Sequence, residues 1–321
     1  MAESRLKEVE TKITSGDQLR GKIRRWLSPP DPSINHNAAC AAHHNGTAAW
    51  FLEGPIYNAW KETGSLLWTR GNRTVYHSLL IPAVDDLWFR SGIGQDCSLV
   101  GDTSASWYRH SLIELTSVTS SSIIKDVESI RAAGLASVAY YYFDFKDTGK
   151  QDRRGLLSSL LTQLCTRSHR CFDVLSDLYE THENGSRQLS EADLILCLKD
   201  VLALPGHGKV YIIVDAMDES PNDPGIPSSR EMVLQLMQEL VILHHPDIRL
   251  CITSRPEVDI QTILESLTSH SVSLHNEGGQ RKDIVNYIES VVESDANMRR
   301  RWRAEDRQLI IDSLSKNANG M

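Results

Sequence analysis

Val210-Tyr211-Ile212-Ile213-Val214-Asp215-Ala216-Met217-Asp218-Glu219 is the stretch that decides the fold. Its five consecutive apolar residues predict a strand that is buried on both faces. Three carboxylates follow within five residues, at the carboxyl end of that strand, which is where open α/β sheets bind ligands. A carboxylate there can hold Mg²⁺, mostly through water, and a second one can orient or deprotonate an attacking water. A solvated acidic turn is the alternative interpretation.

Strands and helices alternate around this stretch. Nearly continuous apolar or β-branched runs predict strands at 66–69, 137–145, 210–214, 249–253 and 272–274. Helical spacing predicts helices at 35–62, 122–133, 154–166, 172–182, 191–202, 229–244, 258–267, 282–292 and 303–316. Such alternation is typical of a parallel sheet with helices on both faces, so we expect a three-layer α/β fold. Residues 72–120 have no sustained period, and no regular element is expected there.

A second strand ends in polar residues about one βαβ unit further on. It reads Leu250-Cys251-Ile252-Thr253-Ser254-Arg255-Pro256-Glu257. An arginine at a strand tip can contact a terminal phosphate. By itself it could equally be a surface arginine before the proline that starts a helix. Together with the acidic strand, the pattern favours the phosphate role.

Composition excludes several classes of protein. The 321 residues carry a formal net charge of −8, which disfavours general nucleic-acid binding. No apolar run reaches the ~18–20 residues of a membrane span, and the charged N-terminus is unlike a secretory signal. Six scattered cysteines indicate reduced thiols rather than a disulfide scaffold. We therefore expect a cytoplasmic protein of one large or two ordinary domains, with no nucleic-acid or membrane partner.

Three further clusters favour ordinary structural roles. His36, Cys40 and His43 share a helix face but lack a fourth ligand for a metal. Cys165 and Cys171 do not form a C-x-x-C motif, and the arginines at 299–303 are typical of a solvated helix start.

Taken together, several segments resemble the NACHT-type signalling NTPases of filamentous and mushroom-forming fungi, members of the STAND class of P-loop ATPases. The resemblance covers about residues 24–71 and 121–321. The segments that carry it are Trp26–Pro32, Trp50–Glu53, Ser65–Trp68, Tyr141–Phe145, Asp215–Glu219, Thr253–Glu257 and Arg301–Asp306.

This resemblance implies a P-loop NTPase core that uses ATP and Mg²⁺. It implies that Asp215 is the Walker B ligand of Mg²⁺, and that Asp218 and Glu219 supply the water-polarising carboxylate. It further implies that Ser254 borders the cofactor and that Arg255 senses the γ-phosphate. In the family, ATP binding is thought to switch an autoinhibited monomer into an oligomer in self/non-self recognition and cell-death signalling. Protein partners, including related NACHT proteins, are therefore expected.

The resemblance also implies a division of the chain. Residues 1–34 would be a helical lead or linker, 35–275 the NTPase core, and 276–321 a C-terminal helical segment. The family continues beyond this point, usually into ankyrin or WD repeats, so we expect this chain to be a truncated core.

The chain departs from the family after the strand at 66–69. The family has a Walker A loop there, whose glycines, lysine and Ser/Thr bind phosphates and Mg²⁺. Gly71 is instead followed by Asn-Arg-Thr-Val-Tyr, and the sequence has no G-x-x-x-x-G-K-[ST]. Residues 72–120 therefore resemble foreign sequence in place of the P-loop. Either the coding sequence retains an intron or misses an exon joint, or the protein has lost its phosphate cradle.

Both explanations predict that this chain binds nucleotide poorly and does not hydrolyse ATP at a useful rate. A switch module with a defective pocket is the leading hypothesis. The alternative is a non-catalytic interaction or scaffold protein derived from such an NTPase.

Overall fold

The computed structural model describes residues 16–41, 48–71, 115–206, 208–223 and 227–274, together with short pieces between 282 and 300 and residues 303–319. Most of the atypical segment, residues 72–114, lies outside the described part, as does most of the helix predicted at 282–292.

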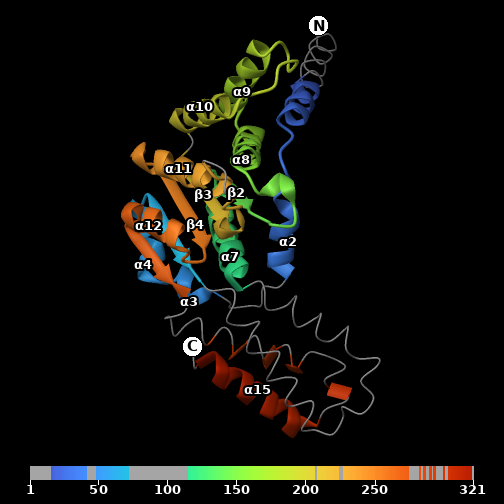
Figure 1. Cartoon of the computed structure of the whole chain (residues 1–321), viewed down its shortest axis with the longest axis vertical. Helices are drawn as coiled ribbons and strands as arrows, with labels where there is room; N and C mark the ends of the chain where they lie inside the picture. Colours follow the sequence, from blue (N-terminus) through green and yellow to red (C-terminus); the bar gives the residue numbers. More distant parts are fainter. Residues whose placement is uncertain are drawn as a thin grey trace. The chain divides into compact units, whose positions relative to one another are not determined.

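Helices and strands alternate along the described chain (Figure 1). The strands are β1 (Leu66–Arg70), β2 (Ala136–Tyr142), β3 (Lys209–Asp215), β4 (Ile248–Ser254) and β5 (His270–Ser273). The α-helices are α2 (Ser33–Ala41), α3 (Ala49–Leu52), α4 (Pro55–Thr63), α7 (Leu115–Ala132), α8 (Arg153–Arg167), α9 (His169–Thr181), α10 (Glu191–Ala203), α11 (Ser229–Ile242), α12 (Val258–Leu267) and α15 (Ala304–Asn319). Residues 16–27 are also helical, and η2 (Thr148–Lys150) and η3 (Met217–Glu219) are short 3₁₀ turns.

The five strands form one parallel sheet in the order β2-β3-β4-β1-β5, with helices around it. All seven residues of β4 are buried, and in β3 every residue after Lys209 is buried. Such continuous burial is expected where helices cover both faces of a parallel sheet. The predicted three-layer α/β class is therefore confirmed.

Several element boundaries differ from the sequence-based expectation, and the stretch predicted as one helix at 35–62 divides into α2, α3 and α4. β2 ends at Tyr142 rather than Phe145, because the chain turns: the amide of Asp144 donates to Lys150 O (3.3 Å), and that of Asp147 donates to Asp144 O (3.1 Å). α7 begins at Leu115, seven residues before the predicted start. Residues 119–122 are a threonine and three serines that lie buried within this helix, and such hydroxyl residues are weak helix formers.

The chain divides into two compact units, residues 1–34 with 127–251, and residues 35–126 with 252–321. In the first unit β2 pairs with β3 in parallel register, with Tyr142 opposite Asp215. α8 packs on β2 and against α9, α10 and α11. Side chains cap the N-termini of α8 and α10. Asp152 accepts from the Gly155 amide at 2.7 Å, and Ser190 forms a capping box with Asp193.

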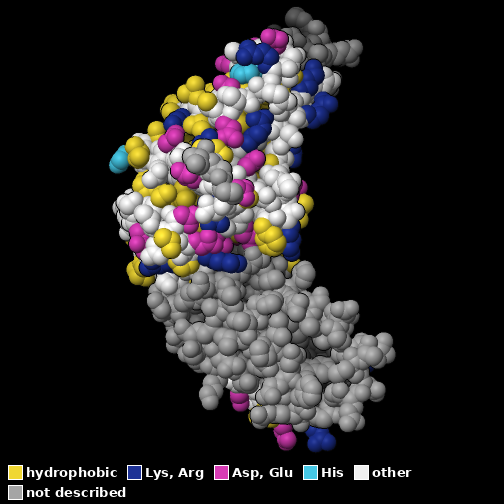
Figure 2. Space-filling view, in the orientation of Figure 1, with side chains coloured by type: hydrophobic (Ala, Val, Ile, Leu, Met, Phe, Trp, Pro, Cys, Tyr) yellow, Lys and Arg dark blue, Asp and Glu magenta, His cyan; other side chains and the backbone are white. Residues whose placement is uncertain are grey.

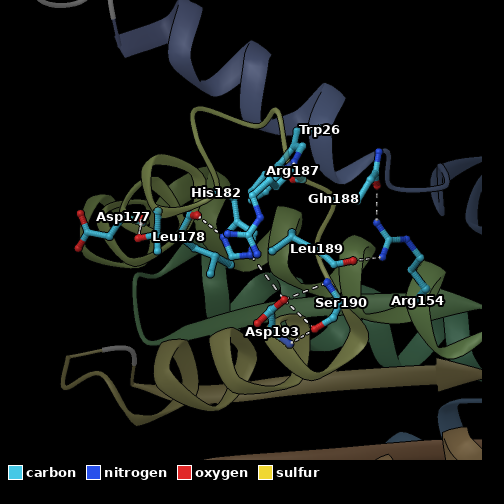
Figure 3. A network of polar contacts seen from close by, with 11 residues as sticks. Trp26, Arg154, Asp177, Leu178, His182, Arg187, Gln188, Leu189, Ser190 and Asp193 are labelled. Carbon is cyan, nitrogen blue, oxygen red and sulfur yellow. Dashed lines mark hydrogen bonds and ion pairs between the residues drawn. The ribbon is translucent and has the colours of Figure 1, made fainter.

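The helix of residues 16–27 packs on the α8–α9 region of the same unit. The Arg20 guanidinium donates to Thr166 O over 3.0 Å and lies 4.1 Å from the ring centre of Phe172. The indole of Trp26 donates to Arg187 O at 2.9 Å (Figure 3). The same ring packs edge-on against Tyr179. These contacts lie on the end of α8, on α9 and on the chain that follows α9.

In the second unit β1 pairs with β5, with Thr69 opposite Val272. α4 joins α7 through Asp126, whose carboxylate accepts from Tyr57 Oη at 2.7 Å and from Lys61 Nζ at 3.0 Å. Trp60 and Trp68 are fully buried and are among the largest side chains of this unit's core.

Candidate functional site

The strand predicted at 210–214 is present and is followed by a carboxylate, as predicted. Asp215 is the last residue of β3, and 1% of it is exposed. Its backbone carbonyl accepts from the Phe143 amide at 3.1 Å, which extends the β2–β3 pairing by one bond. The carboxylate therefore sits on rigid backbone at the carboxyl end of the strand.

A tight turn follows, and we call residues 215–220 the acidic loop. Ala216 adopts a left-handed conformation (φ 54°), and η3 closes with bonds from the Glu219 amide to Ala216 O (2.9 Å) and from the Ser220 amide to Met217 O (3.1 Å). Met217 is fully buried, whereas Asp218 and Glu219 are partly exposed. The turn thus fixes its apolar residue in the core and leaves the two acidic residues partly exposed.

The acidic loop is bonded to the chain that follows β2, residues 143–152, which we call the β2–α8 loop. Glu219 Oε2 accepts from the Phe145 amide at 3.2 Å. The hydroxyl of Ser220 donates to Gln151 O at 2.8 Å, and the Gln151 side chain donates to Phe145 O at 2.7 Å. The two loops therefore hold one another at the same edge of the sheet.

Arg230 binds the acidic loop from α11. Only 6% of this residue is exposed. Its Nη2 donates to Asp218 O at 2.6 Å, its Nε to Ser220 O at 3.0 Å, and its own amide to Pro221 O at 3.0 Å. The first turn of α11 is positioned by Ser228, whose hydroxyl accepts from the Glu231 amide at 3.1 Å.

The carboxylates of the acidic loop suit a cation that keeps several water ligands better than a cation bound by protein ligands alone. Mg²⁺ usually takes one or two carboxylates and keeps several waters or phosphate oxygens. Asp215 can supply one such carboxylate, while one oxygen of Glu219 already accepts from Phe145. Across the described residues, no group of three His, Cys, Asp or Glu side chains could hold a metal by itself. Of a cation's ligands, the acidic loop could therefore supply the single carboxylate of Asp215, and the others would have to come from water or a bound molecule.

The second predicted motif lies in the other unit. Ser254 is the last residue of β4 and is 5% exposed. Its hydroxyl accepts from the Trp68 indole at 2.9 Å, and its carbonyl accepts from the Gly71 amide at 3.2 Å. Arg255 follows directly and is half-buried. The structure thus brings Asp215, Asp218 and Glu219 together in the first unit, and Ser254 and Arg255 together in the second.

Sequence reasoning missed Arg230 and Phe145. Arg230 lies eleven residues after Glu219, beyond a proline-containing connection, so its contact depends on where α11 starts. The helix predicted at 229–244 places Arg230 in its first turn but does not give the direction of the arginine side chain. Phe145 contributes a backbone amide, which residue type does not reveal.

The weaker cysteine and histidine clusters have ordinary environments. Cys40 Sγ lies 3.5 Å from His36 Nε2, while His43 is outside the described residues. A hydrogen bond with Cys171 and then burial raise the pKa of Cys165, and burial raises the pKa of Cys197 to about 12. These thiols stay protonated at neutral pH and are poor nucleophiles.

The visible surface has mixed charge. Figure 2 shows acidic and basic side chains of the described residues interspersed on the face that it draws. In the described part of the chain, no helix combines the length and apolar character that crossing a bilayer requires.

One family model matches the chain, and it covers much of the first unit. No curated protein and no solved structure matches. The matched residues, 116–255, run from α7 through the acidic loop to Arg255 and make up somewhat less than half of the chain. Residues 116–255 are thus similar to the family described as Nephrocystin 3, N-terminal, a NACHT-like, NTPase-related region.

Proposed function

We propose that this chain is a NACHT/STAND-type signal-transduction module whose acidic loop faces Mg²⁺ and nucleotide, and whose nucleotide binding is weak. The observation that carries the proposal is the buried Asp215 at the carboxyl end of β3, with Asp218 and Glu219 presented by the next turn. The family match over residues 116–255 supports the same kind of fold.

Each residue has a role in this proposal. Asp215 would hold the cation through one carboxylate, and the cation would neutralise phosphate charge. The bond from Phe145 fixes one oxygen of Glu219, and the other oxygen would polarise an attacking water, together with Asp218. Arg255 would bind a terminal phosphate and report its presence, with Ser254 next to it.

Weak binding follows from the sequence after Gly71. Most triphosphate affinity in such folds comes from backbone amides and a lysine at the start of the next helix. The stretch Asn72-Arg73-Thr74-Val75-Tyr76 supplies no such glycine–lysine pattern. Three carboxylates without a cradle would repel an anion.

The proposed role is therefore that of a switch with an impaired pocket. It would act in the cytoplasm, in self/non-self or cell-death signalling of the fungal type, and would form oligomers with itself or with intact relatives. The second candidate is a scaffold that keeps the sheet and helices to pair with such relatives and has no turnover. The missing glycine–lysine pattern supports this second candidate as well, because a scaffold needs no bound nucleotide.

Two experiments test the proposal. Phosphate release from Mg²⁺–ATP by the purified chain should equal that of the Asp215→Asn variant, and release that depends on Asp215 would contradict the impaired pocket. Sequencing the transcript across the codons for Gly71 to Ser121 separates the alternatives. A transcript that encodes a glycine-rich loop with Lys-Ser/Thr would support an active ATPase. A transcript that matches the present sequence would support the scaffold.

A further inference from the structure

We propose that Arg230 is a positioning residue that fixes the acidic loop, so that removing its guanidinium frees the loop without unfolding the sheet. The proposal concerns the same site as the proposed function and adds a residue that no sequence motif assigns. Arg230 belongs to α11, is 6% exposed, and lies eleven residues after Glu219.

The hydrogen bonds made by residue 230 indicate why this position is occupied by an arginine. Its guanidinium donates in two directions at once, to Asp218 O and to Ser220 O, which lie on either side of Glu219. A planar guanidinium has several donors in a fixed fork, whereas an ammonium is a single point donor. Holding two carbonyls of one turn therefore suits arginine, and lysine can satisfy only one of them at full length.

The hydrogen bonds of Arg230 hold the backbone of the turn that carries Asp218 and Glu219. With Asp218 O and Ser220 O held, the bonds from the Glu219 amide to Ala216 O and from the Ser220 amide to Met217 O keep their short distances. Glu219 then reaches the Phe145 amide. Loss of the guanidinium would leave the buried carbonyl of Ser220 and the part-buried carbonyl of Asp218 without these donors, and the turn would open to find water.

The same unit offers a matched control. Arg249 in β4 is also a buried arginine, with 4% exposure, and it also donates to backbone carbonyls, those of Pro246 (2.6 Å) and Ile248 (3.1 Å). These carbonyls lie at the amino end of β4, the opposite edge of the sheet from the acidic loop. Replacing either arginine by methionine removes comparable donors and keeps a similar apolar stem.

The first experiment is hydrogen exchange of the full chain, measured for the wild type and for Arg230→Met, Arg230→Lys and Arg249→Met. We expect Arg230→Met to speed exchange of the Phe145, Glu219 and Ser220 amides about 10-fold or more, while the amides within β3 stay protected. Arg230→Lys should give an intermediate increase. Arg249→Met should speed exchange at Ile248 and leave the acidic loop unchanged.

Two results would overturn the proposal. One is unchanged exchange at Glu219 and Ser220 in Arg230→Met. The other is an equal increase at β3 and at the acidic loop, because this would mean general destabilisation rather than loss of positioning.

The second experiment is Mn²⁺ titration followed by paramagnetic resonance, with the metal alone as the probe. Binding that is lost in Asp215→Asn should weaken about 10-fold in Arg230→Met and stay unchanged in Arg249→Met. Equal Asp215-dependent binding in wild type and Arg230→Met would contradict the positioning role. If the wild type binds no better than Asp215→Asn, the metal role in the proposed function fails, and the exchange result still decides the role of Arg230.

Discussion

The backbone amide of Phe145 donates a 3.2 Å hydrogen bond to the carboxylate of Glu219. Phe145 follows β2 and Glu219 follows β3, so this bond joins the turns at the carboxyl ends of two neighbouring strands. The residue that the family resemblance assigns to water activation is thus also part of the contact between two loops.

Replacing Glu219 should separate these two roles. Glu219→Ala removes the acceptor of the Phe145 amide and should lower the free energy of unfolding by about 1 kcal/mol. Glu219→Gln keeps a side-chain oxygen that can accept the bond, so it should retain most of that stability. Urea unfolding followed by circular dichroism measures both, and equal losses in the two variants would argue against a structural role for the bond.

Ser254 should contribute measurably to the stability of the second unit. The Trp68 indole is fully buried and donates to the Ser254 hydroxyl, so Ser254→Ala leaves a buried N–H without that acceptor. We expect a loss of about 1–3 kcal/mol in the free energy of unfolding. A cycle with Trp68→Phe should show a coupling of about 1 kcal/mol, and strictly additive single variants would mean that the bond contributes nothing.

Two glycines should respond in opposite ways to alanine. A Cβ at Gly155 would lie 2.2 Å from Gly149 O and 2.9 Å from Tyr141 Oη, so Gly155→Ala should cost about 1–3 kcal/mol. Gly21 lies within the helix of residues 16–27, and a Cβ there would meet nothing within 4 Å. Gly21→Ala should therefore stabilise the protein by about 0.5–1 kcal/mol. Thermal unfolding compares the two, and destabilisation by Gly21→Ala would contradict the helix assignment.

The capping box of α10 should make the free energy of unfolding depend on pH in the acidic range. Hydrogen bonds from the Ser190 hydroxyl and amide lower the pKa of Asp193 below its usual value (Figure 3). A carboxylate with a lowered folded pKa stabilises the protein fully above its unfolded pKa of about 3.9, and this contribution is lost as the pH falls through the folded value. Asp193→Asn should therefore reduce the difference in urea midpoint between pH 7 and pH 3. An unchanged difference would mean that the carboxylate is not involved.

The sequence predicted the acidic strand well because its signal is local. Five apolar residues followed by Asp215 specify both a buried strand and the edge at which the carboxylate emerges, and no distant contact is needed to see this. The helix predicted at 258–267 likewise agrees with α12, which begins just after Pro256.

Other features depend on contacts that residue types do not reveal. β2 was expected to continue through Phe145, whose apolar side chain is in fact exposed in the β2–α8 loop. The direction of Arg230 depends on how α11 packs after a connection containing Pro221, and its partners are backbone carbonyls. Tertiary packing, rather than local propensity, decides such cases.

The impaired nucleotide pocket is tested by the affinity of the full chain for a fluorescent ATP analogue in the presence of Mg²⁺, measured beside Asp215→Ala. We expect a dissociation constant above about 100 μM for the chain, because the phosphate-binding loop is missing. Nanomolar-to-micromolar binding that Asp215→Ala abolishes would contradict it, since the chain would then hold a working nucleotide pocket.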